Sequence, residues 1–131
     1  MKITVDTNVL VRALVCDDPA QAQAAGKILS EATLIAVSLS CLCELTWVLR
    51  KVYAFQAADI VLAIRALMAA TNVEMDRPAV EVGLVMLESG GDFADGVIAQ
   101  EGRQLGGEIF ASFDKRAVAL LASKGHLAQL L

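Results

Sequence analysis

Five carboxylates stand where apolar segments begin or end along this chain of 131 residues, at positions where solvated charge is not expected. They are Asp6, Glu44, Asp92, Asp95 and Asp114. Carboxylates gathered in one cleft repel each other, so a fold that brings them together either protonates some of them or binds a divalent cation. A cation held in this way can activate water for attack on a phosphodiester bond. The set therefore suggests a metal-dependent hydrolytic site.

Short apolar strands alternate with helices along the whole chain. The pattern predicts strands at residues 3–5, 34–37, 72–75 and 108–111, and helices at residues 19–30, 41–52, 57–68, 78–87, 92–105 and 115–124. A further helical turn is expected at residues 9–14. Such alternation is typical of an α/β protein whose parallel sheet is covered by helices on both faces. No repeat or low-complexity linker interrupts it, so residues 1–131 are expected to form a single domain.

Four of the carboxylates lie at junctions between predicted elements. Asp6 and Asp114 directly follow the first and fourth strands, and ligands bind at the carboxyl ends of strands in open α/β sheets. Asp92 and Asp95 stand three residues apart at a helix start, so both project from the same side of its first turn. Helix capping explains each of these positions equally well. Both interpretations stay open at this point.

Glu44 lies in an apolar segment of the predicted helix 41–52. Between residues 41 and 49 only Glu44 and Thr46 are polar, and the spacing predicts that Glu44 is on a buried face. A buried carboxylate requires a partner, which can be a metal ion or a cation such as Arg12 or Arg50. The alternative is exposure at the edge of the apolar stripe.

Four sequence blocks, in this order and spacing, resemble the PIN-domain ribonucleases and, within them, the VapC-like toxins of bacterial toxin-antitoxin pairs. The blocks are VDTNVL at residues 5–10, CELTWVLR at 43–50, DFADGVIA at 92–99 and ASFD at 111–114. The resemblance covers nearly the whole chain. It implies a single PIN domain over residues 1–131, built as a three-layer sandwich around a parallel sheet of four or five strands.

The resemblance also implies an activity and a set of site residues. The acidic quartet of the family corresponds to Asp6, Glu44, Asp95 and Asp114, with Asp92 as an auxiliary carboxylate. Mg²⁺ or Mn²⁺, hydrolysis of RNA, a homodimer and a cognate antitoxin are then expected. Hydroxyl and amide groups near the quartet are candidates for orienting ligands or the scissile phosphate: Thr7, Asn8 and Ser112.

Two positions depart from the family pattern. Gly96 stands where alanine is usual, and we expect it to weaken the helix start by about 1 kcal/mol relative to alanine. Ser112 replaces a frequent threonine but keeps a hydroxyl that can donate to a carboxylate.

The charge balance excludes a protein that binds nucleic acid through a global basic field, because the net charge is −4. Contacts to phosphate would have to be local. Six cations could form a rim of local phosphate contacts, although each is also explained as ordinary solvated surface: Arg12, Arg50, Lys51, Arg103, Lys115 and Arg116.

Residue counts and segment lengths argue against some kinds of catalytic and metal site and predict where the protein is located. His126 is the only histidine, which excludes a ribonuclease that uses a histidine pair and argues against zinc. The three cysteines read as buried thiols of a reducing compartment. The longest uncharged segment, residues 32–43, is too short to span a membrane, and the amino terminus does not resemble a signal peptide. We therefore expect a cytoplasmic protein.

Two other functions compete with the ribonuclease. An aspartate-based phosphotransfer domain also places an aspartate after a strand, but Asn8 stands where a phosphatase would have its second acid. A catalytically silent PIN-like module that binds a protein partner is the other alternative, and the complete acidic set argues against it. A hydrophobic content of 56% further suggests that apolar helices around residues 47–68 are covered in a dimer.

Overall fold

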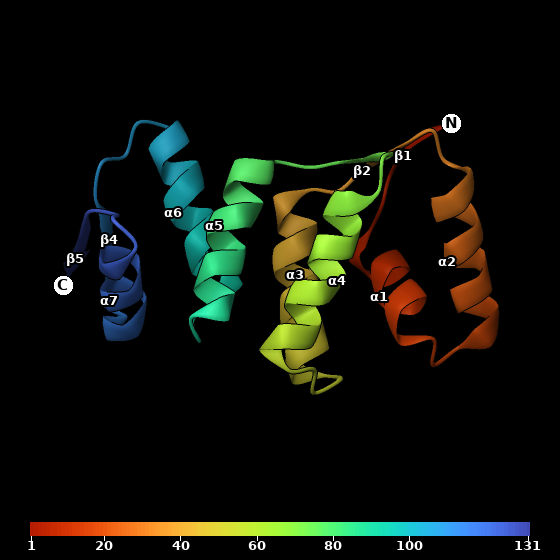
Figure 1. Ribbon diagram of the computed structural model, residues 1–131, viewed down its shortest axis with the longest axis horizontal. Coiled ribbons are helices and arrows are strands. Elements are labelled where there is room, and N and C mark those ends of the chain that lie inside the picture. Colours follow the sequence, from red (N-terminus) through yellow and green to blue (C-terminus); the bar gives the residue numbers. More distant parts are fainter. The chain divides into compact units, whose positions relative to one another are not determined.

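The structure, a computed structural model, describes all 131 residues, and its contacts group them into two compact units. The first unit, Met1–Asp76, contains β1 (Lys2–Thr4), α1 (Thr7–Val15), α2 (Pro19–Glu31), β2 (Leu34–Ala36), α3 (Leu39–Lys51), α4 (Ala57–Ala69) and β3 (Val73–Glu74) (Figure 1). The second, Arg77–Leu131, contains α5 (Arg77–Glu88), α6 (Phe93–Gln104), β4 (Phe110–Ser112), α7 (Lys115–Ser123) and β5 (Ala128–Leu130). The single domain expected for residues 1–131 stays a prediction.

The first unit is built on a parallel sheet with the strand order β1-β2-β3. Ile35 at the centre of β2 pairs with Ile3 on one side and with Val73 on the other. Helix α1 packs against α2 and α3, and α4 packs against α3 and β3. Aliphatic side chains fill this core; the largest fully buried ones are Leu10, Leu42, Leu45, Leu49, Ile60 and Ile64.

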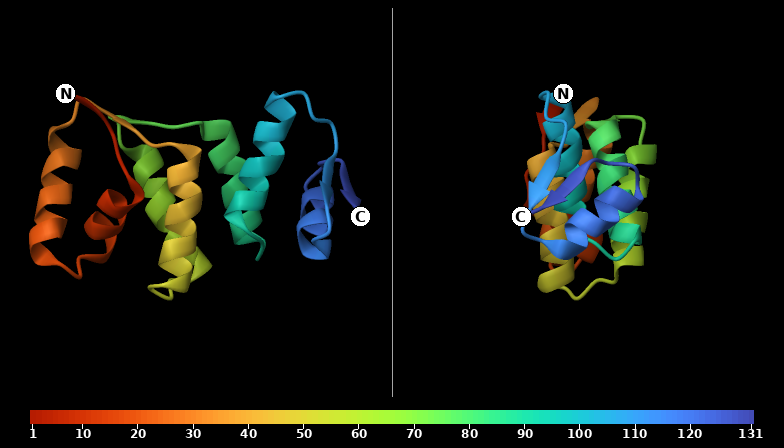
Figure 2. Two further views of the ribbon diagram at one scale, coloured as in Figure 1. Left: turned by 180° about the vertical axis from the view of Figure 1, so that it is seen from behind. Right: turned by 90° about the vertical axis from the view of Figure 1, so that its left-hand side faces the viewer.

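The second unit combines a helix pair with a two-stranded parallel sheet. Helices α5 and α6 lie side by side (Figures 1 and 2), and α7 packs against both β4 and β5. A small cluster of Met86, Ala99 and Leu121 joins these parts, since Phe110 and Ala128 of the two strands pack against it. The ring of Phe93, the first residue of α6, is fully buried.

The predicted α/β class is confirmed, and every predicted helix is present within a few residues of its expected bounds. The strands, however, are hydrogen-bonded as groups of three and two, where one sheet of four or five was expected. Residues 108 and 109 are outside β4, because the segment after Gly106, which has φ +103°, is still turning at that point. The fifth strand, Ala128–Leu130, is too short to show a period in the sequence.

Gly96 has a different role from the one its sequence predicted. A Cβ atom at Gly96 would lie 2.6 Å from the Val82 carbonyl oxygen and 2.8 Å from the Gly83 Cα atom. Both are backbone atoms of α5, which cannot move aside cheaply. Gly96 therefore permits the close approach of α5 and α6, and alanine would not simply strengthen the helix.

We predict that Gly96→Ala lowers the melting temperature, because overpacking of about 1–3 kcal/mol exceeds the gain in helix propensity of about 1 kcal/mol. Gly102→Ala is the matched control on the same helix, since a Cβ there would meet nothing within 4 Å. That control should raise the melting temperature. If both variants were stabilised, α5 and α6 would not be in contact through Gly96.

Candidate active site

Asp6 lies between β1 and α1 and is the N-cap of that helix. Its extended backbone ends the strand segment, and its Oδ1 accepts a hydrogen bond of 2.7 Å from the Thr7 N–H. The Asp6 side chain is exposed, whereas Thr7 is buried. The capping interpretation is thus correct for Asp6, but the cap occupies only Oδ1 and leaves Oδ2 available for a ligand.

Cys41, near the start of α3, links Asp6 to Glu44. Burial raises the pKa of the Cys41 thiol, hydrogen bonding with the Thr7 side chain opposes this, and the negative charges of Asp6 and Glu44 add to it. Both carboxylates must be near the thiol to act on it electrostatically. The structure therefore brings Asp6 and Glu44 into one neighbourhood within the first unit.

The prediction that Glu44 lies on a buried face is wrong, because its side chain is exposed. The buried stripe of α3 consists of Cys41, Leu42, Leu45, Thr46 and Leu49. The buried polar residue of this helix is Thr46, whose hydroxyl donates to the Cys43 carbonyl at 2.9 Å.

Neither arginine considered as a partner forms an ion pair with Glu44. Arg12 is bound to Asp17 at 2.8 Å instead, and the hydroxyl group of Tyr53 donates to the same carboxylate at 3.1 Å. Glu44 therefore stands at the edge of the apolar stripe as a free carboxylate, which was the third alternative.

In the second unit Asp95 is the carboxylate whose pKa departs from its ordinary value. It is half-buried in the first turn of α6, and Asp92 is the N-cap of the same helix. Burial raises the pKa of Asp95, and the negative charges of Asp92 and Asp114 raise it further. The Asp92 side chain makes no capping hydrogen bond, so its carboxylate is not used by the helix. These three acids therefore form a second neighbourhood of negative charge.

Asp114 is the N-cap of α7 and is held firmly by the backbone. Its Oδ1 accepts hydrogen bonds of 3.0 Å from the N–H groups of Arg116 and Ala117. The Asp114 N–H donates to the Ser112 Oγ at 3.0 Å, so the hydroxyl at the end of β4 is fixed beside the cap. As at Asp6, one carboxylate oxygen caps the helix and the other is left for a ligand.

The two remaining candidates for ligand orientation differ in their surroundings. Thr7 is buried and hydrogen-bonded with Cys41. Asn8 is exposed in the first turn of α1, and its side chain makes no hydrogen bond in the structure. Of the two, Asn8 is free to contact a phosphate.

The chemistry of these donors fits a hard divalent cation. Each neighbourhood offers carboxylate oxygens, which Mg²⁺ and Mn²⁺ prefer. The one thiol among them, Cys41, has a raised pKa and stays protonated at neutral pH, so it does not offer the thiolate that a soft metal requires. No group of three or more His, Cys, Asp and Glu side chains has metal-binding geometry in the structure.

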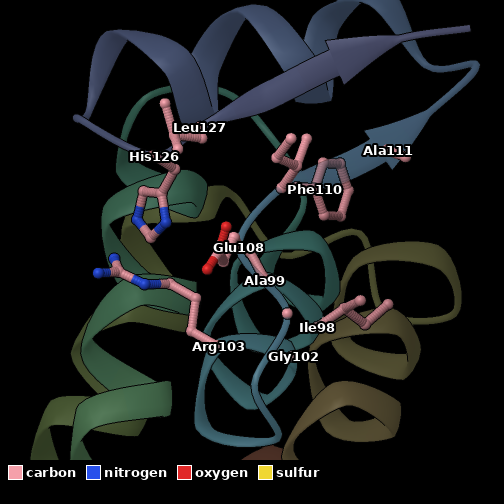
Figure 3. A pocket seen from close by; sticks show the side chains of 11 residues that line it. Ile98, Ala99, Gly102, Arg103, Glu108, Phe110, Ala111, His126 and Leu127 are labelled. Atoms are coloured by element: carbon pink, nitrogen blue, oxygen red, sulfur yellow. The ribbon is translucent and has the colours of Figure 1, made fainter.

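A pocket of about 240 Å³ in the second unit contains none of the predicted site residues. Figure 3 shows Arg103 of α6, Glu108 and His126 on its wall, together with Phe110 and Leu127. The Nδ1 atom of His126 is buried without a hydrogen-bond partner. Burial lowers the pKa of His126, and the charge of Arg103 lowers it further. No sequence signal joined these residues, since they come from separate elements with no motif spacing.

An α/β fold with aspartate N-caps does not by itself identify a function, because one architecture carries many activities. Comparison with known families is more specific: residues 3–122 match the PIN domain, so the chain belongs to the PIN-domain family. The match spans both compact units. PIN domains are typically metal-dependent nucleases and generally use Mg²⁺ or Mn²⁺. No curated protein matches the chain significantly. None of its helices has the length and apolar character needed to cross a membrane.

We predict that Asp95→Asn raises the melting temperature of the metal-free protein at neutral pH. The pKa of Asp95 is raised in the folded state. Protonated Asp95 is therefore tolerated fully at low pH. As the pH rises through the folded pKa, Asp95 becomes charged and the folded protein loses stability relative to the unfolded chain. The advantage of the variant should be largest at neutral pH and shrink as the pH falls toward about 4.

Thermal melting in EDTA across this pH range measures the effect. Glu101→Gln is the matched control, because it removes an exposed negative charge from the same helix. A variant that melts below the parent at neutral pH would show that the surroundings of Asp95 stabilise its charge.

Proposed function

We propose that this protein is a divalent-metal-dependent endoribonuclease and the toxin of a toxin-antitoxin pair. The observation that carries the proposal is the placement of carboxylates at the starts of α1, α6 and α7 in a chain that belongs to the PIN-domain family. Repulsion at Asp95 gives these acids a reason to bind a cation, because a cation would relieve it.

In this proposal the carboxylates that hold Mg²⁺ or Mn²⁺ are Asp6 and Glu44 in the first unit, and Asp92, Asp95 and Asp114 in the second. When bound, the cation supplies an activated water for in-line attack on a phosphodiester and offsets charge on the leaving oxygen. The caps keep Asp6 and Asp114 in place through their Oδ1 atoms. The free Asn8 amide beside Asp6 and the Ser112 hydroxyl beside Asp114 are the groups available to orient ligands or a phosphate within their own units.

The proposed partner is an antitoxin with a basic, partly disordered carboxyl-terminal segment that folds on binding. Without metal, the carboxylates create a negative potential that an arginine can neutralise with bidentate hydrogen bonds. Such an arginine would compete with the cation for these carboxylates. Antitoxin binding and metal binding would then be mutually exclusive, and the antitoxin would inhibit the protein in this way.

We also propose a homodimer. Leu62 of α4 is 68% exposed and Val52, just after α3, is 61% exposed. Large apolar side chains that remain in water favour association, and a symmetric dimer covers the same patch on both copies.

The proposed activity predicts that the purified protein cleaves single-stranded RNA with Mn²⁺ and not with EDTA. Asp6→Asn, Glu44→Gln, Asp95→Asn and Asp114→Asn should each lose at least 100-fold in rate, since each removes a group that holds the cation. Glu31→Gln serves as the matched control for Glu44→Gln, because Glu31 is an exposed glutamate in the last turn of α2.

Thermal melting separates a lost site from a lost fold. Mn²⁺ at 100 times its dissociation constant should stabilise the parent by about 2.7 kcal/mol, and should stabilise Asp95→Asn less. Full activity in the Asp6 and Asp95 variants would refute the assignment of metal ligands. A parent that binds Mn²⁺ without cleaving RNA would point to a catalytically silent module.

A further inference from the structure

The exposed face of α3 carries a tryptophan beside a proposed metal-site residue. Trp47 is 59% exposed, although it is the largest apolar side chain of the helix, and it is the only tryptophan of the chain. Glu44 precedes it by three residues and Lys51 follows it by four, and both are exposed. This spacing places all three on one helical face. The face is opposite to the leucines that fill the core.

The same face offers cations that are not paired elsewhere. Arg50 and Lys51, in the last turn of α3, are exposed and form no ion pair in the structure, whereas Arg12 is held by Asp17. The distances along the helix are short. At about 1.5 Å per residue, Trp47 is about 4.5 Å from Glu44 along the axis, and Lys51 is about 6 Å further.

An aromatic ring flanked by free cations suits a nucleic acid better than a second copy of the chain. The core of a protein interface is depleted in charged residues, and Trp47 has charged neighbours one turn away in both directions. Single-stranded RNA has bases whose faces are open to an aromatic ring, and its phosphates attract cations. In a duplex those faces are already stacked.

We propose that Trp47 stacks on a base of single-stranded RNA next to the phosphate that is cut, while Arg50 and Lys51 contact a flanking phosphate. The proposal rests on the proposed function, because it takes Glu44 as part of the site. It adds a positioning residue that does not touch the reacting atoms. Stacking tolerates every base, so Trp47 would set the position of the strand and not its sequence.

The lone tryptophan makes the contact directly observable. Titrating the metal-free protein with a short unpaired oligoribonucleotide in EDTA and about 50 mM salt should quench Trp47 fluorescence, with no cleavage to interfere. Fluorescence anisotropy of a labelled oligonucleotide gives the affinity for all variants. Trp47→Ala should weaken binding about 5- to 150-fold, equivalent to about 1–3 kcal/mol, and Trp47→Phe should retain most of it.

Two matched variants separate stacking from other effects. Leu105→Ala also shortens a large apolar side chain, which is 89% exposed just after α6, and should bind RNA like the parent. The logarithm of the binding constant falls with the logarithm of salt concentration, and Lys51→Gln should reduce the slope by the contribution of about one phosphate contact. The quenching of Trp47 should stay intact. Thermal melting of each variant confirms that it folds.

Several outcomes would overturn the proposal. Binding without quenching, equal quenching by an RNA duplex, or light scattering in which Trp47→Ala converts a dimer to a monomer would each assign Trp47 another role. A parallel assay of the parent with Mn²⁺ keeps the two proposals distinct. Quenching without cleavage would refute the metal-dependent hydrolysis alone, and cleavage without quenching would refute the stacking alone.

Discussion

The starts of three helices impose the main electrostatic constraint on this protein. Asp6, Asp92 and Asp114 are the N-caps of α1, α6 and α7, where unpaired N–H groups and the helix dipole favour negative charge. At Asp6 and Asp114 the capping hydrogen bonds also orient the carboxylate. Capping and ligand binding are therefore compatible there, because the cap uses one carboxylate oxygen of two.

The helix start that bears Asp92 and Asp95 is fixed by packing. Phe93, which lies between them, is fully buried, and a Cβ atom at Gly83 would come within 2.7 Å of its ring. The ring is thus seated on α5 at a position that only glycine leaves open, while Gly96 brings the two backbones together one turn later. This packing holds Asp95 half-buried beside Asp92, at the cost of repulsion between them. A cation bound there, as in the proposed function, would relieve this repulsion.

Local sequence signals predicted most of the fold and the placement of the caps. Capping residues, apolar periodicity and glycine stops act over one or two turns, so they identify α1, α3, α6 and α7 and the acids that precede or begin them. Features that depend on packing between elements were predicted less well. The face of Glu44 was predicted wrongly because residues 41–49 are apolar nearly throughout, so their pattern does not show that the side with Leu42, Leu45 and Leu49 is the buried one. The role of Gly96 and the pocket around His126 depend on contacts between elements, which spacing along the chain does not contain.

A net charge of −4 limits how this protein would retain RNA under the proposed function. Each cation that neutralises a phosphate of a single strand contributes a salt-dependence slope of only about 0.7, so two free cations on α3 add little affinity at physiological salt. Stacking on an aromatic ring is much less sensitive to salt, and one base contributes as much as several screened ion pairs. Under the proposed function, an acidic protein that approaches a polyanion therefore benefits most from an aromatic contact near the site. Trp47 is the one exposed tryptophan that the chain places beside Glu44.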